Sequence, residues 1–146
     1  MHRFLTYWLP PIAWAAMILS ASSDVFSASH TDGWIEVLIS WLGRSLSPPA
    51  LDLLNQILRK IGHVTAYGIL SALSFRALRG ARPRWNPRWA LGAIALAALV
   101  ASIDEYHQSF IPSRTGTWHD VVLDTAAAIM VQITIRTAQV LLFPPT

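Results

Sequence analysis

Four apolar segments divide the chain, at Phe4 to Ala21, Ile61 to Leu78, Trp89 to Ile103 and Val121 to Leu142. A helix needs about 20 mostly apolar residues to cross a bilayer. The third segment reaches that length only if its helix continues past Asp104 and Glu105. We therefore predict an all-α fold, a four-transmembrane-helix bundle forming one domain over 1–146, with spans at about 4–21, 61–78, 89–108 and 120–142.

The connection between the first two spans has a helical pattern of its own. Apolar side chains recur at the spacing of one helix face at Trp34, Val37, Leu38, Trp41 and Leu42. This pattern predicts an extracytoplasmic amphipathic helix lying along the membrane surface. Ser47-Pro48-Pro49 ends it, and Leu51 to Leu58 begins a second amphipathic stretch that can run into the second span. The surface helix is either a loop element packed over the bundle or a lid over a site.

Positive charge predicts the orientation. The short loop between the second and third spans carries Arg79, Arg82, Arg84 and Arg88, and the positive-inside rule places such a loop in the cytoplasm. Both termini are then cytoplasmic, in the bacterial inner membrane. The eight acidic residues all fall at the outer side, at Asp24, Asp32, Glu36, Asp52, Asp104, Glu105, Asp120 and Asp124. An alternative is that the first span is a signal peptide cleaved near Ser20-Ala21-Ser22.

Composition limits the classes of function. Apolar residues make up 53% of the chain and charged residues 13%, which favours lipid as the solvent. The absence of cysteine excludes disulfides and thiol nucleophiles. The net charge of +3 is not arranged as a basic patch with interleaved aromatics. We expect membrane lipids as partners and no nucleic acid, and we predict no cofactor; the oligomeric state stays open.

Polar residues gather at the outer ends of three spans. They are Lys60, His63 and Tyr67 on the second, Asp104, Glu105 and Gln108 on the third, Asp120 and Asp124 on the fourth, and Arg114 in the connection before it. Ionisable groups at membrane depth cost about 2.5–3.5 kcal/mol each unless they face one another or a polar cavity. We therefore predict that these nine residues form an outward-facing, net acidic ligand-binding pocket, in which Lys60 and Arg114 neutralise part of the charge.

The same residues supply candidates for chemistry. Glu105, Asp104 and His63 are the candidate acid, base or proton carrier if the protein is an enzyme, although no catalytic residue can be assigned. Carboxylates with His63, His107 or His119 have the donor atoms for a metal ion. No tight ligand spacing is present, and so the sequence predicts no metal.

These positions also carry a family resemblance. The string from Asp104-Glu105 through Gln108, Ile111-Pro112 and Arg114 to Asp120 and Asp124, with the upstream Lys60, His63 and Tyr67 and the Ser22-Ser23 pair, resembles the VanZ-like family. The resemblance covers about residues 4–140. It departs at Asp124, where the family usually has Asn, and at Ala127, where it usually has Gly. The family is named for a protein of teicoplanin resistance, and the resemblance implies an envelope role without implying a catalytic one.

Three functions follow from this pattern. The first is a cell-envelope accessory protein whose pocket binds a lipid head group or a lipid-linked envelope precursor. The second is a membrane-embedded hydrolase or transferase acting on a lipid-linked substrate. The third is an ion-pair network that only orients the helices.

Overall fold

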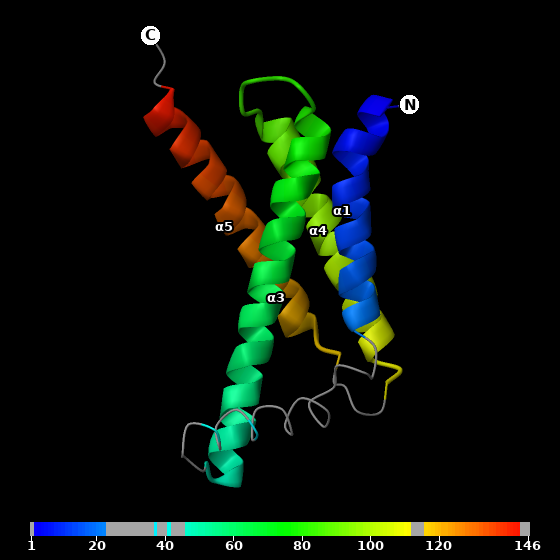
Figure 1. Ribbon diagram of the computed structural model, residues 1–146, viewed down its shortest axis with the longest axis vertical. Helices are drawn as coiled ribbons and strands as arrows, with labels where there is room; N and C mark the ends of the chain where they lie inside the picture. Colours follow the sequence, from blue (N-terminus) through cyan, green and yellow to red (C-terminus); the bar gives the residue numbers. More distant parts are fainter. Residues whose placement is uncertain (1, 23–36, 38–40, 42–45, 112–115, 144–146) are drawn as a thin grey trace.

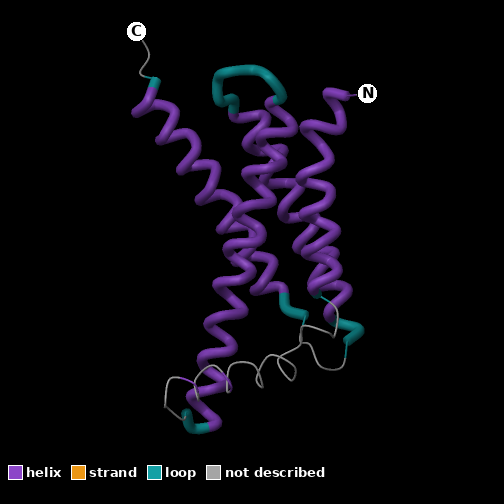
Figure 2. Tube along the Cα trace, viewed as in Figure 1, coloured by secondary structure: helices purple, strands orange, loops and turns teal. Residues whose placement is uncertain are grey.

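The computed structural model describes residues 2–22, 37, 41, 46–111 and 116–143. They form four α-helices: α1 (His2–Ala21), α3 (Pro48–Arg79), α4 (Pro87–Gln108) and α5 (Trp118–Leu142). No strand occurs within these ranges, which confirms the all-α prediction (Figures 1 and 2). The surface helix predicted around residues 34–42 lies outside the described residues, except for Val37 and Trp41, whose side chains are exposed.

Three of the described helices are long and apolar enough to cross a membrane: α1 over Phe4–Ala21, α4 and α5. The helix α3, which contains the predicted second span, does not reach the same apolar threshold. It carries His63, Thr65, Ser71, Ser74 and Arg76 among its apolar residues. Three of the four predicted spans thus lie in helices with the length and apolar composition that a membrane span requires.

Helix α3 is one continuous helix of 32 residues, so the amphipathic stretch predicted at Leu51 to Leu58 does run into the second span. It begins at Pro48 and Pro49. Proline suits the first turn because N–H groups there have no acceptor within the helix, so the missing N–H costs no hydrogen bond. The helix ends at Gly80, whose φ of 61° and ψ of −135° form a backbone conformation that glycine adopts far more readily than other residues. The Gly80 N–H donates to the Arg76 carbonyl at 3.0 Å.

The helix termini lie toward two opposite ends of the bundle. Figure 1 shows the start of α1, the end of α5 and the loop joining α3 to α4 at one end, while α1 finishes and α5 starts toward the other. Four arginines at the first end stack on aromatic rings: Arg76 on Tyr7, Arg79 on Phe75, Arg82 on Trp89 and Arg136 on Trp85, at 5.2–5.9 Å from the ring centroids. Such cation–π contacts hold the charges beside apolar surface. The arginine-rich end and the acid-rich end are thus opposite ends of the molecule.

The buried face of α4 is made of alanine. Ala90, Ala93, Ala97 and Ala101 are between 0% and 5% exposed and recur every three or four residues. Small residues let helix backbones approach closely, and these alanines pack in the two core clusters with residues of α1, α3 and α5. The same seam continues toward the end of α4, so the next side chains on it, beginning with Asp104, are buried as well.

Candidate functional site

Helices α3 and α5 are joined by a ladder of polar contacts. Arg59 Nη2 lies 2.9 Å from Asp120 Oδ2, and His63 Nδ1 lies 3.1 Å from Asp124 Oδ2. Two turns further on, Gln132 Nε2 donates to Ser71 Oγ at 2.8 Å. The partners in all three contacts are 61 residues apart, because both helices run in the same direction (Figure 1) and advance in steps of four residues.

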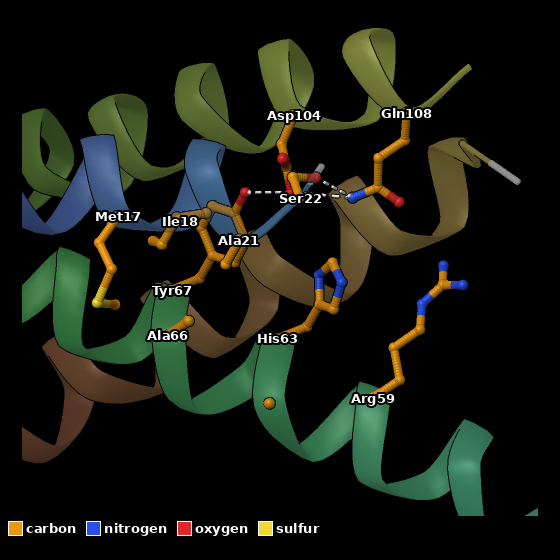
Figure 3. A pocket seen from close by; sticks show the side chains of 11 residues that line it. Met17, Ile18, Ala21, Ser22, Arg59, His63, Ala66, Tyr67, Asp104 and Gln108 are labelled. Carbon is orange, nitrogen blue, oxygen red and sulfur yellow. Dashed lines mark hydrogen bonds between the residues drawn. The ribbon is translucent and has the colours of Figure 1, made fainter. Parts of the chain in front are cut away.

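Helix α4 adds a second set of contacts, drawn in Figure 3. Asp104 Oδ2 accepts from the Tyr67 hydroxyl at 3.1 Å and from Gln108 Nε2 at 3.2 Å. Gln108 Nε2 also donates to Ser22 Oγ, just after α1, at 2.7 Å. This network connects α1, α3 and α4 and is almost fully buried, with Tyr67 and Gln108 each 1% exposed.

Glu105 is held by the chain that leads into α5. Its Oε2 accepts from the Thr117 backbone N–H at 2.7 Å. That chain passes so close to the end of α4 that a Cβ on Gly116 would meet the Glu105 carbonyl and lie 2.9 Å from the Ser109 nitrogen. Glycine at position 116 therefore permits the approach that fixes the Glu105 carboxylate.

His63, Glu105 and Asp124 come together where α3, α4 and α5 meet. Each offers one ligand-type atom, and these three atoms lie within 4.8 Å of one another. Asp124 and Glu105 are 0% and 5% exposed, and the His63 side chain is 15% exposed. The arrangement can hold a proton between the groups or accept a cation.

The buried site has more acceptors than donors. One oxygen of each of four side chains is buried without a hydrogen-bond partner among the described residues: Asp104 Oδ1, Glu105 Oε1, Gln108 Oε1 and Asp124 Oδ1. Buried polar atoms nearly always have a partner, because each one left without costs about 1–3 kcal/mol. Four such oxygens in one region mean that the site can receive donors or positive charge beyond those of the described residues.

A pocket of about 260 Å³ opens onto this network between α1, α3 and α4. Its α1 side is formed largely by Met17, Ile18 and Ala21, which are apolar. The polar lining groups are Ser22, Arg59, His63, Tyr67, Asp104 and Gln108. Figure 3 shows Met17, Ile18 and Ala66 toward one end of the pocket and Arg59, His63 and Gln108 toward the other. The pocket therefore combines an apolar wall with a polar, acceptor-rich end.

Most of the residues predicted for the pocket are brought together. His63, Tyr67, Asp104, Glu105, Gln108, Asp120 and Asp124 all take part in the contacts above. Arg114 lies outside the described residues. His107 and His119, considered as metal donors, are exposed.

The expected inward placement of Lys60 needs correction. Lys60 is exposed, and its neighbour Arg59 makes the ion pair instead. The cause is the four-residue step along which α3 faces α5: Arg59 lies four residues before His63 on that stripe, whereas Lys60 lies three residues before it and is rotated away. The regular spacing of Arg59, His63, Tyr67 and Ser71 is the sequence signal that identifies the stripe.

Comparison with known proteins gives one family. A family model described as VanZ/LLP1 matches residues 7–139. No curated protein and no solved structure matches the chain. The match covers nearly the whole chain, including every helix that contributes to the site. The chain is thus an α-helical membrane protein, and it belongs to the VanZ/LLP1 family.

Proposed function

We propose that this protein is an accessory protein of the bacterial cell envelope whose pocket binds the head group of a membrane lipid or of a lipid-linked envelope precursor. The observation that carries the proposal is the pocket itself, whose lining combines apolar residues of α1 with Asp104 and Gln108, and each of these two side chains has one buried oxygen without a partner among the described residues. An amphiphile has the matching two parts. Through such a lipid the protein would influence envelope properties and the access of glycopeptides such as teicoplanin, as the family resemblance implies.

The polar end favours a particular head-group chemistry. Asp104 Oδ1 and Gln108 Oε1 are acceptors without donors among the described residues, and they suit an ammonium or hydroxyl group. Arg59 also lines the pocket, and its side chain is 35% exposed, so its guanidinium can approach a phosphate while it remains paired with Asp120. A zwitterionic head group with an amine and a phosphate satisfies both.

The proposed membrane arrangement places this pocket outside. Arg76, Arg79, Arg82 and Arg136 lie at the opposite end of the bundle and contact aromatic rings there, a combination typical of a cytoplasmic interface. In this proposal α3 also crosses the membrane, which brings the number of spans to four. It packs among the three apolar helices and buries its polar side chains against α4 and α5. The pocket then opens at the outer leaflet.

Lipid selectivity tests the proposal. We expect purified protein in nanodiscs to retain phosphatidylethanolamine in preference to phosphatidylglycerol when bound lipids are counted by native mass spectrometry. Asp104→Asn should lower the apparent affinity for phosphatidylethanolamine about tenfold, or 1.4 kcal/mol, because it removes the charge facing the ammonium group. Asp52→Asn is the matched control, since Asp52 is exposed on α3. An unchanged preference in folded Asp104→Asn protein would contradict the proposal.

A second candidate is a membrane-embedded hydrolase or transferase acting on a lipid-linked substrate. The observation in its favour is the His63–Asp124 contact at 3.1 Å, because a carboxylate that orients an imidazole is the usual arrangement of a general base. Turnover of lipid phosphates that is lost in His63→Gln would support it. Absence of turnover across the lipids of the envelope would exclude it.

A further inference from the structure

We infer that His63, Glu105 and Asp124 form a binding site for one divalent first-row transition-metal ion at the junction of α3, α4 and α5. This site goes beyond the lipid-binding proposal and does not depend on it. Metal binding by these residues requires only the three side chains, whereas the lipid would occupy the pocket that His63 lines and to which Glu105 and Asp124 do not contribute.

The separation of the three donor atoms suits a metal ion. Zinc lies about 2.0–2.2 Å from nitrogen and carboxylate oxygen ligands in a tetrahedral arrangement, so two of its ligand atoms are about 3.3–3.6 Å apart. The atoms of His63, Glu105 and Asp124 all lie within 4.8 Å of one another. Side-chain movements of at most about 1.5 Å would bring the donor atoms to the separation that zinc requires.

Unpartnered oxygens give independent support. Asp124 Oδ1 and Glu105 Oε1 are buried and have no donor among the described residues, although the two side chains are 0% and 5% exposed. A bound cation would satisfy both oxygens at once. If these side chains served only as an ion-pair network between the helices of the chain, a donor would be expected opposite each of these two oxygens.

The balance of charge around the site points the same way. Four described carboxylates lie in this region, those of Asp104, Glu105, Asp120 and Asp124, and the described cations that contact them are Arg59 and, when protonated, His63. Even with His63 charged, carboxylates outnumber cations among these described groups, at a depth where unpaired charge is costly. A divalent ion would correct that deficit.

Neighbouring contacts hold one ligand in place and neutralise a carboxylate beside another. The Thr117 backbone N–H donates to Glu105 Oε2 at 2.7 Å, which leaves Oε1 free. Asp120, one turn before Asp124 on α5, is neutralised by Arg59 at 2.9 Å. Outer hydrogen bonds of this kind orient metal ligands and raise affinity.

The ligand set indicates the class of metal. One imidazole nitrogen with two carboxylates suits Zn²⁺ or Mn²⁺, whereas Mg²⁺ and Ca²⁺ prefer oxygen ligands alone and Cu⁺ prefers sulfur. Three protein ligands also leave at least one position for water or another ligand.

The test uses the full-length protein in lipid-free detergent, stripped with a chelator and titrated with Zn²⁺ alone. We expect one equivalent of Zn²⁺ by calorimetry and elemental analysis, with the affinity lowered at least tenfold in His63→Gln and in Glu105→Gln. His107→Gln is the matched control, because His107 is exposed at the same end of α4, and it should bind as wild type. Melting curves by circular dichroism establish that each variant is folded.

X-ray absorption of the wild-type protein keeps the test decisive if a variant does not fold, since the spectrum of bound zinc should contain scattering from one imidazole. Absence of stoichiometric Zn²⁺ binding, absence of imidazole scattering, or full affinity in folded His63→Gln and Glu105→Gln would each overturn the inference. The assay contains no lipid, so its failure leaves the lipid proposal standing, and the reverse is also true.

Discussion

Replacing Ala97 by leucine should destabilise the protein by about 3 kcal/mol, near the upper end of the usual cost of overpacking a close-packed interior. Ala97 is 0% exposed and lies in the core cluster with Tyr67, Leu70 and Ala128. Three additional carbon atoms there would push α4 away from its neighbours. The free energy of unfolding, measured by titration with a denaturing detergent, gives the effect directly.

The matched control is Ala95→Leu on the same helix. Ala95 is exposed, so the same added side chain would meet lipid or detergent, and a change within about 0.5 kcal/mol is expected. Equal destabilisation by the two substitutions would show that α4 does not pack through its alanine face.

Asp124→Ala should have an effect of similar size, a loss of about 3 kcal/mol in the free energy of unfolding. The substitution removes the partner of His63 and leaves the imidazole buried beside Glu105, and breaking a buried pair from one side typically costs about 3–5 kcal/mol. We place the value at the lower end because polar groups also find partners in the unfolded state within a membrane. The same detergent titration measures it.

Two further substitutions serve as comparisons for Asp124→Ala. Asp52→Ala removes an exposed carboxylate from α3 and should change stability by less than about 0.5 kcal/mol. Asp124→Asn, which installs the residue usual in the VanZ-like pattern, should keep much of the stability because the amide can still hydrogen bond to His63, while zinc binding falls. If Asp124→Ala proves as neutral as Asp52→Ala, the His63–Asp124 contact does not hold α3 to α5.

Much of this fold could be predicted from the positions of apolar residues. The described helices include all four predicted spans, and α4 ends at Gln108 as expected once Asp104 and Glu105 are counted as part of its helix. Hydropathy could not identify the alanine face of α4, because alanine counts the same wherever it lies in an apolar run. Hydropathy also could not decide whether α3 crosses the membrane, because the polar residues of α3 lower its mean hydropathy even where they are buried against other helices.

The sequence predicted which residue types form the candidate site and at which end of the helices they lie. It did not predict which side chains contact one another. Spacing within one helix placed His63 and Tyr67 on one stripe, yet the choice between Arg59 and Lys60 depends on the angle at which α3 meets α5. The Ser71–Gln132 contact was missed for the same reason. The grouping of His63, Glu105 and Asp124 comes from three different helices, so no local spacing in the sequence could indicate it.

The most direct test of the central claim, that the pocket holds a lipid head group, uses the methionines of this chain. The protein has three, of which Met17 lines the pocket and Met130 is 61% exposed on α5. A photoreactive methionine analogue incorporated in living bacteria would crosslink lipid at both positions. We predict that adducts at position 17 are enriched in amine-bearing lipid relative to those at position 130, and that Asp104→Asn abolishes the enrichment. The same lipid composition at both positions in the wild-type protein would contradict the account.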